Sequence, residues 1–203
     1  MIVVKVGGSL YDHPGLGPGL RAYLDTIPSP VLLVPGGGAF AEAVRQLDAV
    51  HGLGEEASHR LALTSLIVTG GFLRSLVPQS KWVSHPSIGK IPHRGILDAA
   101  AFCQYEPSLP HSWAVTSDSI AARAAVVFGA SRLVLLKSID IPPETPWAEA
   151  ADRGWVDRHF PAVVEGSALR IEAVNYRRWL DEHFPPTENV FRPAGTSDPA
   201  RGY

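Results

Sequence analysis

Two short apolar segments, each closed by a glycine turn, constrain the fold most strongly. Residues 2–6 read IVVKV and run into a Gly-Gly pair, and residues 31–34 read VLLV and run into Pro35 and three glycines. A short apolar run that ends in glycine is typical of a buried strand. Glycine lets main-chain N–H groups approach phosphate oxygens because no Cβ stands in the way, and a following helix N-terminus favours negative charge. The two turns therefore predict a phosphate site between adjacent parallel strands.

The rest of the chain alternates between strand-like and helix-like segments. Further strands are expected at 81–84, 112–116, 132–137 and 169–174, and helices at 19–26, after Gly38, and at 55–76, 95–104, 118–128 and 176–183. This alternation predicts an α/β protein with a mainly parallel sheet, whose ligands bind at the carboxyl ends of the strands. The Gly70-Gly71 pair predicts a break or kink in the helix at 55–76.

Composition limits the classes of function. The chain has 203 residues, 45% of them hydrophobic, which suits one domain, and the break in pattern at 105–111 divides it into lobes at 1–110 and 111–203. A net charge of −2 without a basic cluster argues against a nucleic-acid partner. Cys103 is the one cysteine, so no internal disulfide or cysteine-based zinc site is expected. The chain shows no export leader and no apolar run long enough for a membrane span, so a cytoplasmic protein without a membrane partner is expected.

Two charged residues near the predicted turns are candidates for chemistry. Lysine is uncommon in a buried strand, so Lys5 either neutralises charge on a transferring phosphoryl group or lies on an edge strand and points to water. Asp118 lies near a helix N-terminus, where it either caps the helix or holds Lys5 in place around the phosphates. The sequence lacks the usual P-loop pattern, so its phosphate site is of another type.

In these motifs the chain resembles the amino acid kinase superfamily, which includes acetylglutamate kinase, uridylate kinase and isopentenyl phosphate kinase. The resemblance lies in VVKVGGSL (3–10), LLVPGGGAFAEAVRQLD (32–48) and TSDSIAARAAVVFGASRLVLLKSID (116–140), in that order. It implies a three-layer αβα sandwich and a phosphotransferase that uses ATP and Mg²⁺. The lobe at 1–110 would bind the acceptor and phosphates, the lobe at 111–203 would bind the nucleotide, and the protein would form a dimer or larger homo-oligomer.

The resemblance also implies a role for each matching residue. Lys5 would stabilise the transferring phosphoryl group, and Asp118 would hold the lysines in place. ATP would be bound by Gly7, Gly8, Ser9, Thr116, Ser117, Lys137 and Asp140, and the acceptor would face Gly36, Gly37 and Gly38. Many members carry a second catalytic lysine late in the nucleotide lobe, but this sequence has no lysine after Lys137. Lys137 or an arginine would have to supply that charge.

Three further segments are similar to the small aminomethylfuran phosphate kinases of methanofuran biosynthesis. They are VRQLDAVHGLGEEASHRLAL (44–63), SWAVTSDSIAA (112–122) and GWVDRHFP (154–161). These kinases convert [5-(aminomethyl)furan-3-yl]methyl phosphate, a small phosphorylated substrate, into its diphosphate. The resemblance implies that Asp48 and His59 line the acceptor pocket and that Arg45, Arg60 or Lys90 binds the acceptor phosphate.

Other interpretations stay open at this point. The acceptor could be isopentenyl phosphate, a nucleoside monophosphate or an acyl-amino acid. The protein could also be a non-catalytic nucleotide or oxyanion storage protein on the same fold, which a sizeable cavity lined by His or Glu would support. His51 and His59 lie two helical turns apart without a third ligand at suitable spacing, so no protein metal site is expected.

Overall fold

One six-stranded sheet forms the centre of the molecule. The structure is a computed structural model that describes residues 1–86 and 91–186. The strand order is β3-β4-β2-β1-β5-β6. The strands are β1 (Ile2–Val6), β2 (Val31–Pro35), β3 (Lys81–Val83), β4 (Arg94–Leu97), β5 (Arg132–Lys137) and β6 (Arg170–Asn175). Every neighbouring pair of these strands is parallel, which confirms the predicted α/β class.

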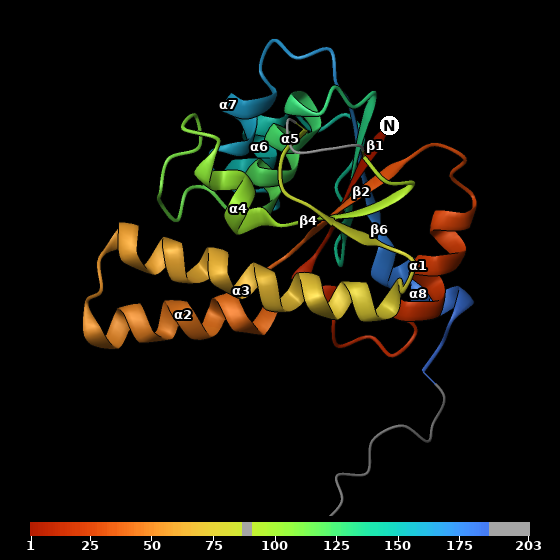
Figure 1. The fold of residues 1–203 in the computed structure, drawn as a ribbon, viewed down its shortest axis with the longest axis horizontal. Helices are drawn as coiled ribbons and strands as arrows, with labels where there is room; N and C mark the ends of the chain where they lie inside the picture. Colours follow the sequence, from red (N-terminus) through yellow and green to blue (C-terminus); the bar gives the residue numbers. More distant parts are fainter. Residues whose placement is uncertain (87–90, 187–203) are drawn as a thin grey trace, which may run out of the picture.

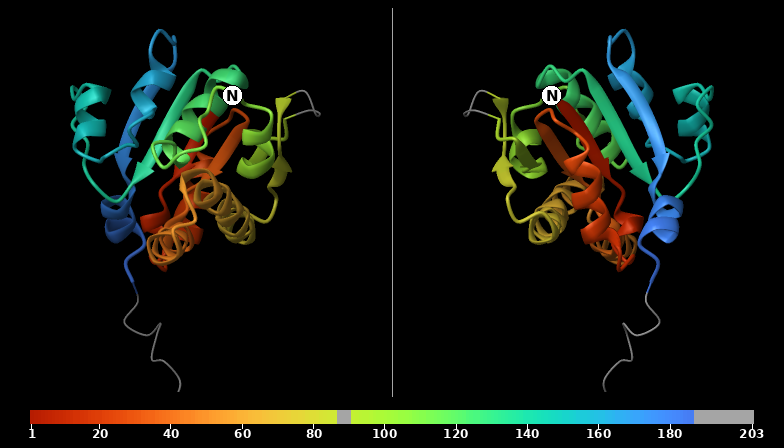
Figure 2. Two further views of the ribbon diagram at one scale, coloured as in Figure 1. Left: turned by 90° about the vertical axis from the view of Figure 1, so that its left-hand side faces the viewer. Right: turned by 90° about the vertical axis from the view of Figure 1, so that its right-hand side faces the viewer.

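Helices cover both faces of the sheet, so the molecule is a three-layer αβα sandwich (Figures 1 and 2). The helices are a short 3₁₀ helix (Gly8–Leu10), α1 (Leu16–Asp25), α2 (Gly38–His51), α3 (Glu55–Leu76), α4 (Ala99–Gln104), α5 (Ser117–Val127), α6 (Trp147–Asp152), α7 (Phe160–Val164) and α8 (Tyr176–His183). Helices α4 to α7 contribute to the hydrophobic cluster on one face, and α1 and α8 contribute to the cluster on the other. Within the two described ranges, no helix is long and apolar enough to cross a membrane.

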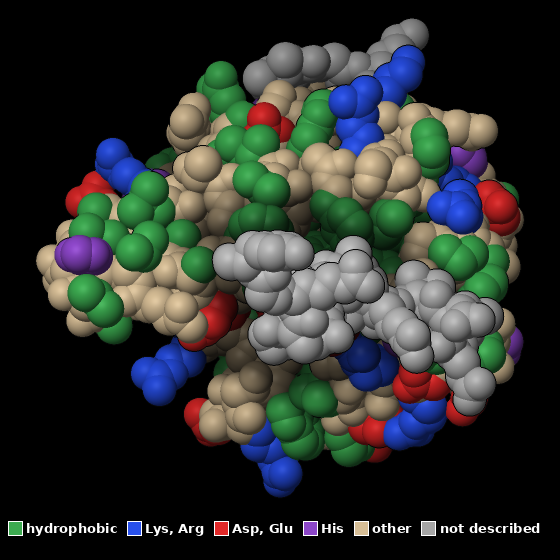
Figure 3. Space-filling view, turned by 90° about the horizontal axis from the view of Figure 1, so that it is seen from below, with side chains coloured by type: hydrophobic (Ala, Val, Ile, Leu, Met, Phe, Trp, Pro, Cys, Tyr) green, Lys and Arg blue, Asp and Glu red, His purple; other side chains and the backbone are tan. Residues whose placement is uncertain are grey.

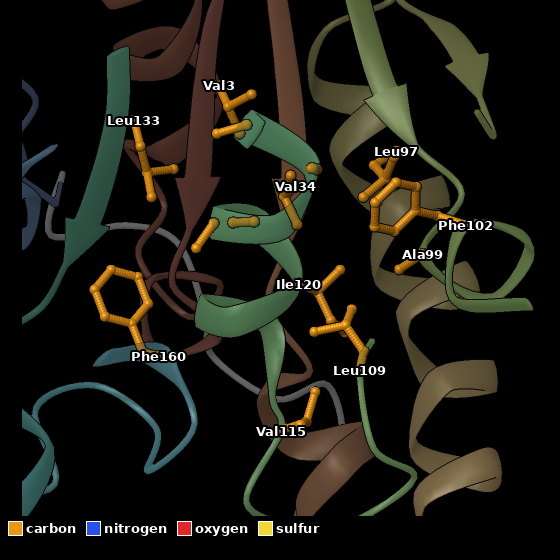
Figure 4. Packing of buried hydrophobic residues seen from close by; sticks show 14 of the residues in the cluster. Val3, Val34, Leu97, Ala99, Phe102, Leu109, Val115, Ile120, Leu133 and Phe160 are labelled. Carbon is orange, nitrogen blue, oxygen red and sulfur yellow. The ribbon is translucent and has the colours of Figure 1, made fainter. Parts of the chain in front are cut away.

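The side chains of the central strands alternate between these two clusters. Val3, Val34 and Leu133 face α5, as Figure 4 shows, whereas Val4, Leu33 and Val134, each one residue away along its strand, belong to the cluster to which α1 and α8 contribute. Side chains alternate between the two faces along a strand. Lys5 lies an even number of residues after Val3 on β1, and Lys137 lies an even number after Leu133 on β5, so both lysines point to the same face as those residues. Both lysines therefore belong to the face that α5 covers.

Helices α2 and α3 form a hairpin that extends beyond the sheet (Figure 1). Helix α2 has no buried residue, and Phe40, Leu47 and Val50 are exposed on it. Figure 3 shows hydrophobic side chains gathered over the projecting end of this hairpin. Helix α3, by contrast, buries nine residues. The position of α2 thus depends on α3 and on the glycine turn from which α2 begins.

The predicted break at Gly70-Gly71 is wrong, because α3 runs without interruption from Glu55 to Leu76. Gly70 serves close packing instead. A Cβ at Gly70 would lie 2.6 Å from the Trp82 ring, whereas a Cβ at Gly71 would meet nothing within 4 Å. The first glycine makes room for the tryptophan of β3, and the second imposes no bend.

Two other expected elements differ in the structure. The segment 95–104 was expected to be one helix, but its start belongs to strand β4, and the helix begins at Ala99 after Asp98 accepts a hydrogen bond from the Ala101 N–H at 3.0 Å. The segment 112–116 was expected to be a strand, but it forms turns. Its backbone N–H groups donate to side chains, as from Trp113 to Glu55 Oε1 at 3.2 Å, or to carbonyls of the same loop, as from Val115 to Ser112 at 3.0 Å, so they do not join the sheet ladder.

Candidate active site

The two glycine turns lie directly against each other at the carboxyl ends of β1 and β2. A Cβ on Gly8 would lie only 2.2 Å from the backbone nitrogen of Gly38, and a Cβ on Gly36 would lie 2.5 Å from the nitrogen of Gly8. Gly38 also has a positive φ of 55°. Glycine is therefore required for the contact between the turns themselves. Phosphate binding at these turns stays a prediction.

Lys5, Asp118 and Lys137 meet beside these turns as a buried charged triad. Strand β1 lies between β2 and β5, so the interpretation of Lys5 as an edge-strand lysine is wrong. The Lys5 Nζ atom lies 2.9 Å from Asp118 Oδ1, and Lys137 Nζ donates a hydrogen bond to Asp118 Oδ2 at 2.6 Å. Lys137 Nζ also donates to the Trp155 carbonyl oxygen at 2.8 Å. One carboxylate thus holds two ammonium groups in place.

The electrostatics of the triad keep it charged at neutral pH. Burial by itself would raise the pKa of Asp118, but the charges of Lys5 and Lys137 outweigh burial and lower that pKa to about 2. Burial lowers the pKa of Lys137 to about 8, with a further contribution from the Lys5 charge and opposition from Asp118. Two ammonium groups against one carboxylate leave a net positive charge, which suits a phosphoryl group.

Asp157, which the sequence analysis did not single out, fixes the helix that carries Asp118. Its carboxylate accepts hydrogen bonds from the backbone N–H groups of Thr116, Ser119 and Phe160, each at 2.9 Å, and from the hydroxyls of Thr116 and Ser119. It therefore caps α5 from a distant segment. Burial and the neighbouring Asp118 charge raise the pKa of Asp157. Its partners in α5 lie 38 and 41 residues away, so no local spacing signal could have identified it.

A cleft of about 850 Å³ opens beside the triad, a volume typical of small-molecule sites. Of the predicted residues, Thr116, Asp118 and Lys137 form part of its wall. The full lining is Arg45, Glu55, Trp113, Ala114, Thr116, Asp118, Lys137, Ala151, Asp152, Gly154, Trp155, Val156, Asp157 and Arg158. The cleft is thus bounded mainly by the start of α5 and the segment from α6 to α7.

A second, smaller cavity of about 60 Å³ adjoins this cleft between α2, α3 and the start of α5. It brings together Gly37, His59 and Ser117, three residues predicted to bind ligands. The other lining residues are Ala41, Arg45, Ala62, Leu63, Leu66, Trp113, Val115, Thr116 and Ile120. Because Arg45, Trp113 and Thr116 line both spaces, the cavity and the cleft share a wall.

Trp113 forms the partition between the cleft and the cavity. The Arg45 guanidinium carbon lies 4.0 Å from the centroid of its ring, a cation–π contact. The indole N–H donates to Ser58 Oγ at 2.9 Å and to Asp48 Oδ2 at 3.3 Å. Hydrogen bonding of the Asp48 carboxylate, first to the Ser58 side chain and then to Trp113, lowers the pKa of Asp48. Asp48 lines neither space and acts on the site through Trp113.

The remaining predicted residues that the structure describes, Lys5 among them, line neither the cleft nor the cavity. Ser9 Oγ lies 2.8 Å from Ser138 Oγ, and Asp140 is paired with Arg178 and accepts from Asn175 Nδ2 at 3.1 Å. Gly7, Gly8, Gly36 and Gly38 line neither space. Arg60 is paired with Glu56 at 2.7 Å, and Lys90 lies outside the described residues.

Two carboxylates singled out from the sequence, Asp118 and Asp140, are already engaged, which bears on magnesium. Asp118 is bound to two lysines, and Asp140 is bound to Arg178. In the part of the chain that the structure describes, no group of three or more His, Cys, Asp or Glu side chains is placed to hold a metal ion. Mg²⁺ commonly binds through substrate phosphates and water. Such a mode, with the ion entering on the nucleotide, fits these residues.

Comparison with solved structures shows that the fold is one shared with uridylate kinases. Uridylate kinase from Archaeoglobus fulgidus superposes with a TM-score of 0.62 at 15% identity over 85% of this chain and 89% of that chain. UMP kinase from Bacillus anthracis gives 0.60 at 12% identity over 86% of each chain. No protein-family model matches the sequence.

Comparison with curated proteins adds a particular relative. The chain is 27% identical over 150 residues to the [5-(aminomethyl)furan-3-yl]methyl phosphate kinase of Methanocaldococcus jannaschii, covering 69% of this chain and 67% of that protein. The resemblance stated from the motifs is thereby confirmed. These relatives are named as kinases, which bears out the predicted enzyme class, a phosphotransferase.

Proposed function

We propose that this protein is an ATP-dependent kinase that transfers a phosphoryl group to the phosphate of a small acceptor. The observation that carries the proposal is the buried triad, in which Asp118 holds Lys5 and Lys137 beside a cleft of about 850 Å³. Two buried lysines on one carboxylate are costly for a fold to maintain, and strongly perturbed charged groups beside a cleft mark a candidate functional site.

The triad's contribution to transfer follows from its charge. Bound ATP supplies the phosphoryl group, and Mg²⁺ would shield charge on its phosphates. Lys5 and Lys137 neutralise negative charge on the equatorial oxygens of the phosphoryl group as an acceptor oxygen forms the new P–O bond and the bond to ADP breaks. Asp118 keeps the two lysines apart and oriented. A phosphate acceptor is already deprotonated at neutral pH, so no protein base is needed.

Arg45 is the proposed partner of the acceptor phosphate. Of Arg45 and Arg60, the two described residues among the three basic candidates, Arg45 lines both the cleft and the adjoining cavity, and Arg60 lines neither. The Trp113 ring holds its guanidinium at 4.0 Å, and a guanidinium suits bidentate contact with phosphate. An acceptor phosphate bound there would approach the triad from the side of α2.

The acceptor we propose is [5-(aminomethyl)furan-3-yl]methyl phosphate, which would become its diphosphate. The 27% identity to the kinase of that name supports this choice. We further propose that residues 1–110 supply the acceptor side and residues 111–203 the nucleotide side, and that the protein works in the cytoplasm as a homo-oligomer. Isopentenyl phosphate, nucleoside monophosphates and acyl-amino acids are the competing acceptors.

Phosphorus NMR of transfer reactions tests the proposal. The protein is incubated with MgATP and, in turn, the aminomethylfuran phosphate, isopentenyl phosphate, uridylate and acetylglutamate. We expect a new diphosphate doublet with the furan phosphate. The Lys5→Ala variant should lose at least about 100-fold in rate, since removal of one group that stabilises transition-state charge costs about 10²–10³-fold.

Lys81→Ala is the matched control, because Lys81 is exposed on β3 and lies far along the sheet from the triad. Its transfer rate should equal that of the wild type. Transfer to a different acceptor would replace the proposed substrate and leave the kinase proposal intact. If the protein binds ATP but transfers a phosphoryl group to none of the four acceptors, that result would refute catalysis and favour a storage protein.

A further inference from the structure

His59 presents a buried hydrogen-bond acceptor that has no partner. The residue is 3% exposed, and its Nε2 atom lies 3.2 Å from the Val115 carbonyl oxygen. A carbonyl oxygen only accepts, so Nε2 carries the hydrogen and Nδ1 carries the lone pair. Nδ1 has no hydrogen-bond partner among the described residues. Buried polar atoms in proteins nearly always have a partner, so this atom points to a missing donor.

The cavity beside His59 limits what that donor can be. Its volume of about 60 Å³ corresponds to roughly two water molecules at ~30 Å³ each. Apart from His59, the wall on the side of α3 is apolar, formed by Ala62, Leu63 and Leu66. The space therefore suits a group of two or three heavy atoms that has an apolar stem and one hydrogen-bond donor.

Among the described residues, one charged side chain lines the cavity, that of Arg45, and two carboxylates lie near the cavity without lining it. Burial, followed by the nearby His111, lowers the pKa of His59, so the imidazole is neutral and its lone pair is available. Glu55 is close enough to act on His59 through its charge, and its carboxylate bonds the backbone of Trp113 at the shared wall. Asp48 adds a second carboxylate behind the Trp113 indole. Arg45, on the same rim, has its guanidinium over the Trp113 ring.

We propose that this cavity is a specificity pocket for a small protonated amine carried by the acceptor, and that His59 Nδ1 accepts a hydrogen bond from its ammonium group. The inference rests on the proposed function, since it assigns one end of the acceptor to the cavity and leaves the phosphate end to Arg45. An aminomethyl group has the two heavy atoms that the cavity holds. The branched alkenyl end of isopentenyl phosphate offers no donor, and a nucleobase exceeds the volume.

Acceptor discrimination tests the pocket. The ratio of kcat/KM for the aminomethylfuran phosphate to that for its analogue with methyl in place of aminomethyl is measured in wild type, His59→Leu, His59→Gln and His51→Leu. The wild-type ratio should be roughly 10- to 100-fold, the effect of leaving a buried acceptor unpaired. His59→Leu should reduce it to within about threefold of unity, and His59→Gln, which keeps an acceptor oxygen, should restore part of it.

His51→Leu is the matched control, because His51 is exposed at the end of α2. It should keep the wild-type ratio. Thermal melting of each variant shows that it is folded before rates are compared. A wild-type ratio near unity, or a ratio that His59→Leu leaves unchanged, would overturn the inference.

A binding measurement separates this inference from the kinase proposal. Histidine labelled with ¹⁵N is followed by NMR in wild type and Lys5→Ala during titration with furfurylamine, and with 2-methylfuran as the probe that lacks the amine. We expect the amine alone to move the His59 Nδ1 resonance in both proteins. A shift without any phosphoryl transfer would refute the kinase and leave the pocket standing. Transfer without a shift would refute the pocket and leave the kinase standing.

Discussion

Asp118→Asn is the substitution whose effect the structure specifies most fully. The change keeps the size of the side chain and removes the charge that holds Lys5 and Lys137. Two buried ammonium groups then lie close together without the carboxylate that pairs with both of them. We expect a loss of stability and, independently, a loss of phosphoryl transfer.

The loss of stability follows from the pKa of Asp118. A pKa lowered from 3.8 to about 2 corresponds to about 2 kcal/mol of stabilisation at neutral pH. Breaking a buried ion pair from one side costs about 3–5 kcal/mol, because the remaining charges stay buried. For a chain of this size we therefore expect the melting temperature to fall by roughly 5–15 °C. Transfer should fall at least about 100-fold, because the lysines lose their fixed positions.

The dependence on pH provides an internal check with a definite sign. A carboxylate whose pKa is lowered by folding contributes stability above its unfolded pKa and loses that stability as pH falls through the folded pKa. The difference in stability between wild type and Asp118→Asn should thus shrink as pH falls from about 3.8 to about 2. Melting curves by calorimetry across that range measure it.

Asp25→Asn is the control, because Asp25 is exposed at the end of α1. It should melt and transfer like the wild type. Equal melting temperature and equal transfer rate in Asp118→Asn would refute the reasoning, since the carboxylate would then be holding nothing that the fold or the reaction needs.

Three further predictions concern other parts of the molecule. Because the pKa of Lys137 is lowered to about 8, the transfer rate should fall as pH rises through that value, and Lys137→Arg should move this alkaline limb upward in a pH–rate profile. Gly8→Ala should disrupt the paired turns and lower the free energy of unfolding, since its Cβ would lie 2.2 Å from the Gly38 nitrogen. Gly71→Ala, whose Cβ would meet nothing within 4 Å, should raise the free energy of unfolding by up to about 1 kcal/mol. Denaturant titration of both variants measures these changes. Leu47→Glu, on the exposed face of α2, should convert the expected homo-oligomer to monomers in light scattering; a wild-type mass would place the contact elsewhere.

The sequence correctly predicted the strands in which nearly every residue is buried. Residues 2–6, 31–34 and 132–137 were expected to be strands because a central parallel strand is apolar on both faces, and the structure places all three at the centre of the sheet. The segment 112–116 was misread because Trp113 and Val115 have strand propensity. Tertiary contacts decide there instead, since side chains of α2 and α3 bind the tryptophan.

The candidate site was predictable where residues lie in a local motif and not where distant segments meet. Lys5, Asp118 and Lys137 each lie at the end of a strand or the start of a helix, so the topology alone brings them together. Asp157 and Trp113 act across about 40 to 65 residues of chain, and neither carries a local signal. The unpartnered Nδ1 of His59 depends on a tautomer that the Val115 carbonyl fixes, which no sequence pattern reports.

The register of the central strands has a consequence for how this site tolerates change. Lys5 pairs with Leu135 across β1 and β5, and Lys137 lies two residues further along its own strand. A slip of one residue in β1 would turn Lys5 to the opposite face of the sheet and leave Asp118 with a single lysine. A one-residue deletion within β1 would therefore remove the net positive charge of the triad, even if the sheet reformed with every hydrogen bond satisfied. In this protein the alignment of two buried strands is itself a determinant of the chemistry.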